Sequence, residues 1–145
     1  YDGPAVFVDE LDELLRRADV VTLHVPLTDE TRHIIDEQSI AHMRPESYLI
    51  NTARGAAVDE KVLAQALSAG RLAGAAIDVF AQEPPDPAHP LQSNPNALLT
   101  PHVAGLSDRA LVRVATEAAK GILDVLQGRH PRSPVNPEIF PLQQR

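Results

Sequence analysis

The sequence predicts an α/β protein with a mostly parallel sheet, and three observations define its expected organisation. Short apolar segments rich in β-branched residues alternate with segments that have the apolar spacing of amphipathic helices, as in strand–helix–strand units. A longer amphipathic segment near the C-terminal end predicts a final helix. Six prolines lie between Pro84 and Pro101 and exclude a helix or a central strand there, because proline lacks the backbone N–H. We therefore expect a long ordered loop in that region, with a disordered linker as the alternative.

The first expected elements are a helix and a strand. The helix covers residues 9–17, with Asp9 as its N-cap, acidic residues in its first turn and arginines in its last, an order that the helix macrodipole favours. Residues 20–25 are largely apolar and β-branched, and Pro26 follows them. This pattern predicts a strand that is buried on both faces.

Helices and strands continue to alternate along the chain. Residues 36–43 predict a short helix. Asp59 is the expected N-cap of another helix, which runs through Leu67 and stops at Gly70. We expect the remaining strands at residues 48–52, 75–80 and 97–100.

The final helix divides the chain into two parts. We expect it to run from Ser107, as its N-cap, to Leu126, with Gly128 just past its end. The tail that follows contains several prolines and is predicted to be irregular chain. The expected boundary therefore separates residues 1–106, which hold the sheet, from residues 107–145, which hold the helix and the tail.

The composition excludes several classes of protein. A net charge of −7, from 13 Lys and Arg against 20 Asp and Glu, is unsuited to binding nucleic acid or an anionic membrane surface. The absence of cysteine excludes disulfides, thiolate metal ligands and a cysteine nucleophile, and we expect no metal site. No segment has the length and apolar character of a membrane span, and no signal-peptide pattern opens the chain. We therefore expect a cytoplasmic protein.

Three polar side chains follow three different strands of the expected sheet. Arg54 comes after the second strand, Glu83 after the third and His102 after the fourth. Because ligands of parallel sheets bind beyond the carboxyl ends of the strands, these residues can converge on one crevice. Arginine offers a fixed fork of donors to a carboxylate, and histidine exchanges a proton near neutral pH. A carboxylate beside the histidine would favour its charged form.

Each of these side chains also has an ordinary interpretation. Arg54 and Glu83 could simply be solvated, and His102 could be a hydrogen-bonded loop histidine. Asp78 is harder to explain in this way, because it lies inside the apolar third strand and a buried carboxylate is costly unless it is paired or hydrogen-bonded. The residues indicate a site only when they are taken together.

These residues lie in three sequence blocks, Asn51–Glu60 (NTARGAAVDE), Ala76–Phe80 (AIDVF) with Glu83–Pro84, and Thr100–Gly105 (TPHVAG), and a fourth block, Ala18–Thr28 (ADVVTLHVPLT), lies further upstream. The blocks resemble the signature blocks of the D-isomer-specific 2-hydroxyacid dehydrogenases, a family that includes glyoxylate, hydroxypyruvate and phosphoglycerate reductases. The resemblance runs from about Phe7 to Glu138, in the order and spacing of the family.

This resemblance implies a partial Rossmann-like fold, doubly wound, that lacks the first βαβ unit and carries a long C-terminal helix. Residues 1–106 would be the second part of a dinucleotide-binding domain. Residues 107–145 would be the helix that returns to the substrate domain, with its tail. The implied activity is transfer of a hydride between NAD(H) or NADP(H) and a small 2-oxo acid or D-2-hydroxy acid.

The resemblance also implies a role for each site residue. Arg54 would bind the substrate carboxylate, His102 would exchange a proton with the substrate oxygen, and Glu83 would hold the imidazole and raise its pKa. Asp78 is the implied partner of the nicotinamide carboxamide. The residues implied to lie along the cofactor are Val25, Thr52, Ala53, Arg54, Asp78, His102, Val103, Ala104 and Gly105.

The sequence departs from the family at the phosphate-binding loop. Its seven glycines form no G-x-G, so the G-x-G-x-x-G turn is absent, and Asp2 is the one candidate for the acidic residue that binds the ribose. We therefore expect part of a longer enzyme, or a short product, that forms a homodimer or pairs with the missing N-terminal half. The alternative function is a non-catalytic, dinucleotide-sensing or scaffold protein of the corepressor kind.

Overall fold

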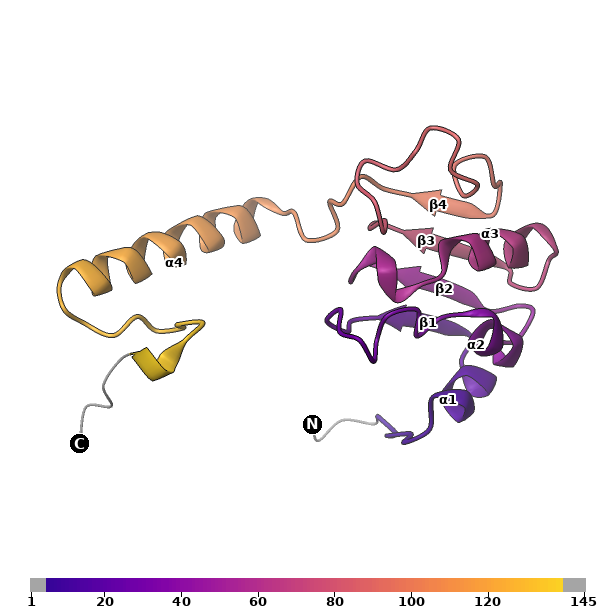
Figure 1. Cartoon of the computed structure of the whole chain (residues 1–145), viewed down its shortest axis with the longest axis horizontal. Helices are drawn as coiled ribbons and strands as arrows, with labels where there is room; N and C mark the ends of the chain where they lie inside the picture. The colour runs from indigo at the N-terminus through magenta and orange to yellow at the C-terminus, as the bar shows by residue number, and fades with distance from the viewer. Residues whose placement is uncertain (1–4, 140–145) are drawn as a thin grey trace. The chain divides into compact units, whose positions relative to one another are not determined.

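A computed structural model describes residues 5–139 of the chain, and Asp2 lies outside them. The chain divides into two compact units, one ending at Ala104 and the other beginning at Gly105. The first unit contains a single four-stranded sheet in the order β1-β2-β3-β4, and every neighbouring pair is parallel (Figure 1). The α/β class and the parallel sheet are therefore confirmed. The strands are β1 (Val20–Leu23), β2 (Tyr48–Asn51), β3 (Gly74–Ile77) and β4 (Ala97–Leu99).

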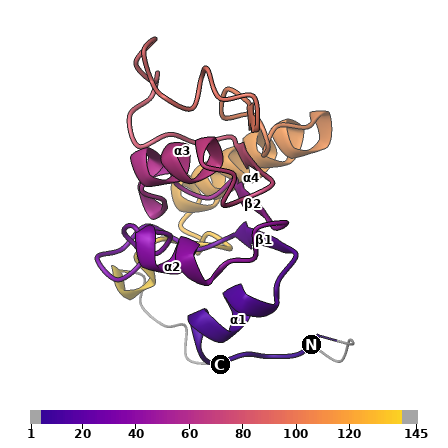
Figure 2. The same cartoon turned by 90° about the vertical axis from the view of Figure 1, so that its right-hand side faces the viewer.

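Three helices pack on one face of this sheet and form the core with it (Figures 1 and 2). They are α1 (Leu11–Arg17), α2 (Glu37–His42) and α3 (Glu60–Ser68). Leu15, Ile40 and Leu63 of the three helices are buried in the same cluster as Leu49 and Ile77 of the sheet. Because side chains alternate between the two faces of a strand, the buried positions of β1 and β2, two residues apart, belong to the face that these helices cover.

The opposite face of the sheet is exposed, and the prediction that the first strand is buried on both faces is wrong. In β1, Val21 and Leu23 are buried, but Val20 is 52% exposed. Tyr48 and Leu98 on the neighbouring strands are 50% and 68% exposed. The apolar run predicted a strand of a two-sided α/β sheet, whereas α1, α2 and α3 cover one side only.

The third strand also ends earlier than expected. β3 stops at Ile77, so Asp78 lies just past the strand rather than inside it. The backbone still follows the sheet for one more residue, since the N–H of Asp78 donates to the carbonyl of Asn51 at 3.0 Å. The first polar group beyond the sheet is therefore held directly at its carboxyl edge.

Helix ends follow local sequence signals with one exception. Asp59 caps α3 by accepting from the N–H groups of Lys61 and Val62, and Gly70 follows the helix with a φ of +67°. Asp36 caps α2 through a reciprocal pair of hydrogen bonds with Ser39. The N-cap of α1 is Glu10, without a side-chain cap, and not the expected Asp9.

The proline-rich segment between β3 and β4 is an ordered loop, as expected, and the linker alternative is wrong. It contains no helix or strand, but its Leu91 is fully buried in the core. Asn94 is also buried, and its amide donates to the carbonyl of Ala64 and the hydroxyl of Ser68 on α3. Side chains of the loop thus attach it to the core and to α3.

The second unit consists of α4 (Asp108–Leu126) and the chain after it, which contains the short 3₁₀ helix η2 (Pro137–Ile139). Ser107 caps α4 through Ala110, and Gly128 just past the helix has a φ of +70°, both as expected. Within residues 5–139, no helix is both long enough and apolar enough to cross a membrane.

Candidate active site

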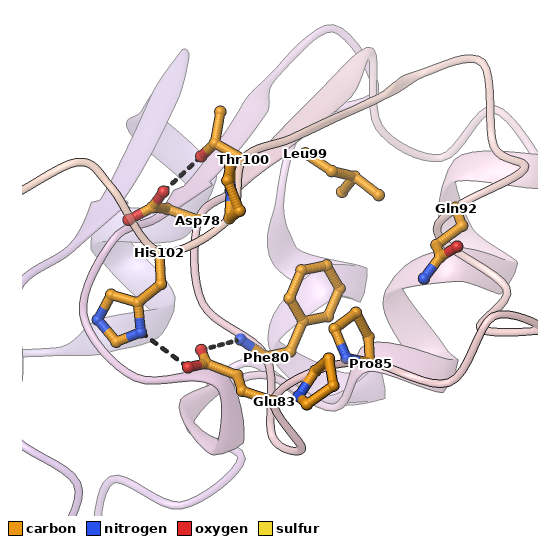
Figure 3. Close-up of a pocket in the computed structure, with 10 residues that line it drawn as sticks. Asp78, Phe80, Glu83, Pro85, Gln92, Leu99, Thr100 and His102 are labelled. Carbon is orange, nitrogen blue, oxygen red and sulfur yellow. Dashed lines mark hydrogen bonds and ion pairs between the residues drawn. The ribbon is translucent and has the colours of Figure 1, made fainter.

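Asp78 joins the end of β3 to the chain that follows β4. Its Oδ1 accepts hydrogen bonds from the Thr100 hydroxyl (2.5 Å) and the N–H of Val103 (2.8 Å), and its Oδ2 accepts from the N–H of Ala104 (2.9 Å). The residue is only 4% exposed. Figure 3 shows the carboxylate beside Thr100, next to His102. One buried side chain therefore holds the backbone of the segment in which His102 lies.

These hydrogen bonds explain how a carboxylate is tolerated at this buried position. Burial by itself raises the pKa of Asp78, but the bonds from Thr100, Ala104 and Val103, together with the nearby His102, outweigh it and bring the pKa below its ordinary value. Asp78 is thus an anion at neutral pH whose charge is stabilised by donors from one loop. Its role toward a cofactor stays a prediction.

Glu83 and His102 form a hydrogen-bonded pair across the two loops. His102 Nδ1 and Glu83 Oε2 are 2.8 Å apart, and the other carboxylate oxygen of Glu83 accepts from the N–H of Phe80 at 3.0 Å (Figure 3). The two contacts lower the pKa of Glu83, the bond to His102 more than the bond to Phe80. Within the described residues, His102 Nε2 has no hydrogen-bond partner, and the side chain is 54% exposed. This nitrogen is therefore accessible to a ligand.

The backbone of His102 has an unusual conformation that the neighbouring contacts stabilise. Its φ is +56°, in the left-handed region that residues with a Cβ rarely adopt. The N–H of His102 donates to the carbonyl of Asp78 at 2.8 Å, and the Asp78 carboxylate binds the two following N–H groups. Backbone strain of this kind persists only where the surroundings determine the conformation. Here they direct the imidazole toward Glu83.

A cavity of about 500 Å³ opens beside this pair. Figure 3 shows Phe80, Pro85 and Leu99 as its apolar wall, with Gln92 at one side and the Glu83–His102 pair at the other. Its lining consists of Asp78, Phe80, Glu83, Pro84, Pro85, Gln92, Leu99, Thr100, Pro101 and His102. An apolar pocket with a few convergent polar groups is the usual form of a small-molecule site.

Arg54 lies beyond β2, at the same carboxyl edge of the sheet, but it does not line this cavity. Its guanidinium donates to the carbonyl of Ala53 at 2.6 Å and is exposed. The buried Asn51 side chain fixes the turn, since it donates to the Arg54 carbonyl and accepts from the N–H of Ala53. The structure thus unites Glu83 with His102 and leaves Arg54 on a neighbouring, well-held turn.

Gly55 brings that turn against the chain after β3. A Cβ placed on Gly55 would lie 1.9 Å from the carbonyl carbon of Phe80 and 2.2 Å from the backbone nitrogen of Ala81. Only glycine allows the two backbones to approach so closely. The N–H of Phe80 donates to Glu83. The close approach of Gly55 to Phe80 therefore places the turn that carries Arg54 next to the segment that holds Glu83.

The other residues expected along a cofactor also lie at or beyond the strand ends. Val25 and Ala53 are half-buried against the core, Thr52 is exposed, and Val103 is 39% exposed. Gly105 is the first residue of the second unit, and a Cβ on it would meet no atom within 4 Å. Their contacts with a nucleotide stay predictions.

The lowered pKa values predict loss of stability in acid. Asp36, Asp78 and Glu83 all have pKa values below the ordinary values of 3.8 for aspartate and 4.5 for glutamate. Their stabilising contribution is therefore complete above the unfolded pKa values and is lost as the pH falls through the folded ones. We expect the Tm, followed by circular dichroism, to decrease between pH ~5 and pH ~3, and Asp78→Asn to make that decrease shallower. A Tm that is constant over this range would contradict the assignment.

Comparison with known proteins identifies the family. The sequence model described as D-isomer specific 2-hydroxyacid dehydrogenase, NAD binding domain, matches residues 3–104. The chain belongs to the D-isomer specific 2-hydroxyacid dehydrogenase family. The expected family resemblance and the Rossmann-like character of the sheet are confirmed.

Individual proteins and solved structures are similar to most of this dehydrogenase-family chain. The glyoxylate reductase of Thermofilum pendens is 46% identical over 137 residues, which are 94% of the chain and 40% of that protein. The crystal structure of the TT0316 protein from Thermus thermophilus has a TM-score of 0.88 at 44% identity, covering 93% of the chain and 43% of its own. The NAD-complexed 2-hydroxyacid dehydrogenase from Lactobacillus delbrueckii ssp. bulgaricus has a TM-score of 0.80 at 34% identity, covering 86% and 42%. The chain thus spans less than half of these proteins.

Sequence reasoning on this dehydrogenase-family chain missed a second glutamate–histidine pair. Glu60, next to the N-cap of α3, and His89, in the proline-rich loop, are bonded to each other and nearly buried. Because Glu60 and His89 are 29 residues apart, no local sequence pattern predicts that they meet. The one available signal was a histidine in a loop that we expected to be ordered.

Proposed function

We propose that this chain contributes the proton-transfer groups of an NAD(P)-dependent dehydrogenase that interconverts a small 2-oxo acid and a D-2-hydroxy acid. The observation that carries the proposal is the 2.8 Å hydrogen bond between Glu83 and His102, at the carboxyl edge of a parallel sheet and beside a cavity. The family of the chain supports the same reaction class.

The pair defines which nitrogen of His102 would react. Glu83 has a lowered pKa and is therefore a carboxylate, which only accepts hydrogen bonds. Nδ1 of His102 must then carry a proton and donate it to Glu83, which leaves Nε2 to exchange a proton with the substrate. During reduction, His102 would give the Nε2 proton to the carbonyl oxygen of the 2-oxo acid, and during oxidation it would take the proton back.

Arg54 would bind the carboxylate common to all of these substrates. Its planar guanidinium suits a bidentate pair with a carboxylate, and its bond to the Ala53 carbonyl is a single exposed contact that a charged ligand can replace. The close approach of Gly55 to Phe80 supports a place for Arg54 near the Glu83–His102 pair. We propose that the substrate carboxylate draws the guanidinium toward this pair.

The residues at the strand ends fit the nicotinamide half of a dinucleotide. Asp78 Oδ2 accepts one hydrogen bond and retains capacity for a second, such as an amide N–H of the carboxamide. Val25, Thr52, Ala53 and the segment 102–105 would line the rest of that half. When bound, the cofactor would supply or accept the hydride. The sequence has no G-x-G-x-x-G turn, and we assign no residue of this chain to the pyrophosphate.

We further propose that the exposed sheet face is covered in the working enzyme. Val20, Tyr48 and Leu98 are half or more exposed on it, an apolar surface of the kind that binds protein. A second copy or the remainder of a longer protein would supply the cover, and residues 107–145 would join the substrate domain. Homodimerisation and a cytoplasmic location stay predictions.

The direct test is oxidation of NADH or NADPH with glyoxylate or hydroxypyruvate, for this chain and for a longer protein that contains it. We expect turnover by the longer protein, and titration calorimetry should detect binding of the reduced nucleotide. Nucleotide binding without turnover on any small 2-oxo acid would favour the non-catalytic alternative. The absence of both nucleotide binding and turnover would contradict the dehydrogenase proposal and the non-catalytic alternative alike.

A further inference from the structure

A second glutamate–histidine pair lies behind the site, between α3 and the proline-rich loop. Glu60 is the first residue of α3, and its Oε2 is 3.1 Å from Nε2 of His89. The two side chains are only 12% and 15% exposed, far less than Glu83 and His102. A nearly buried pair that joins α3 to the loop indicates a role in holding the loop.

The hydrogen bonds of His89 define its protonation. Nδ1 accepts from the N–H of Leu91 at 3.3 Å and therefore carries no proton. Nε2 must then carry the proton and donate it to Glu60. The His89 ring thus accepts at Nδ1 and donates at Nε2, and the two hydrogen bonds orient it between Leu91 and Glu60.

Glu60 and His89 together hold residues 80–81, at the start of the segment in which Glu83 lies. The second oxygen of Glu60, Oε1, accepts from the N–H of Ala81 at 2.7 Å. The ring of His89 meets the ring of Phe80 edge to face, with centroids 5.5 Å apart and an angle of 84° between the planes. Phe80 in turn donates its N–H to Glu83. The contacts therefore connect α3, through residues 80–81, to the carboxylate that binds His102.

We propose that Glu60 and His89 are positioning residues, which hold the loop so that the Glu83 carboxylate meets Nδ1 of His102. This inference rests on the proposed function, because it assigns a supporting role to groups behind the same site. Neither residue lines the cavity, and the ring of His89 contacts one lining residue, Phe80. Loss of the pair would release the backbone of Ala81 and allow Glu83 to turn into solvent.

The pKa of Glu83 is the readout that separates positioning from a purely structural role. Its value is lowered by the bonds from His102 and Phe80, so it reports directly whether the carboxylate still lies between them. Glu60→Gln removes the charge and leaves one acceptor oxygen for two donors, so the amide NH2 faces the N–H of either His89 or Ala81. His89→Ala changes only the loop and provides a second variant if Glu60→Gln does not fold. Glu46→Gln, at an exposed glutamate before β2, is the matched control.

The experiment is a carbon-13 NMR titration of the Glu83 carboxyl in the chain. We expect the titration midpoint to rise in Glu60→Gln and in His89→Ala, by at least half of the rise that His102→Asn produces, and to stay constant in Glu46→Gln. A midpoint that is constant in both positioning variants, while His102→Asn raises it, would overturn the positioning role alone. A midpoint that His102→Asn leaves unchanged would overturn the Glu83–His102 pair, and with it the proposed function.

Discussion

Replacing His102 by asparagine should lower the rate of 2-oxo acid reduction about 10²–10⁴-fold in an active protein that contains this chain. The substitution removes Nε2, the nitrogen that is free to exchange a proton with a substrate oxygen. Asparagine suits the position in other respects, because it tolerates the left-handed backbone that His102 adopts at a φ of +56° better than most residues do. Binding of the reduced nucleotide should change far less than kcat, as measured by steady-state kinetics and by titration calorimetry.

A second histidine substitution controls for general effects. His42→Asn removes an imidazole at the end of α2, where the side chain pairs with Asp12 of α1 at 2.9 Å. We expect its kcat to equal that of the unmodified protein. If His102→Asn retained full kcat, His102 would not be the proton-transfer group, and the reaction would need another acid near the cavity.

Replacing Gly55 by alanine should lower the free energy of unfolding by about 3 kcal/mol or more, the upper range for forcing a side chain into a packed site. The added Cβ would lie 1.9 Å from the carbonyl carbon of Phe80, and backbone atoms cannot move aside as a flexible side chain can. The loop after β3 would have to shift, which would also displace the Phe80 N–H from Glu83. Chemical denaturation of the chain measures the effect on stability.

Gly74→Ala is the matched control within the same unit. Its Cβ would lie 3.1 Å from the carbonyl oxygen of Asn96 and 3.2 Å from the ring of Tyr48, which is half exposed and can move. We expect a loss of about 1 kcal/mol. Equal losses for the two variants would mean that the contact between Gly55 and the Phe80–Ala81 peptide does not determine the local packing.

Short-range signals accounted for the order and ends of most elements. The cap at Asp59, the stop at Gly70 and the cap at Ser107 are decided by side chains and backbone groups within a few residues of each other, so the sequence predicts them. The same reasoning failed at Asp9, because α1 begins one residue later than expected, after Glu10, which makes no side-chain cap. Strand positions were predicted well, and strand ends less well, since pairing with neighbouring strands decides where a strand stops.

The candidate site was predictable only in part. The rule that ligands bind at the carboxyl ends of parallel strands, together with the family blocks, indicated Arg54, Glu83 and His102. The bond between Glu83 and His102 agrees with the expected convergence. The contact of Arg54 with Ala53 could not be predicted, because an exposed side chain adopts whichever local partner the turn offers.

The amino-acid order therefore settles what depends on neighbours along the chain: the helices, the strands, their parallel alternation and the polar groups that follow each strand. Folding in three dimensions settled which of those groups meet. It made Asp78 the acceptor for the chain after β4, brought Gly55 against Phe80, joined Glu60 to His89 and left one sheet face exposed. These contacts join residues far apart in sequence, and their geometry depends on how whole elements pack, which no local pattern encodes.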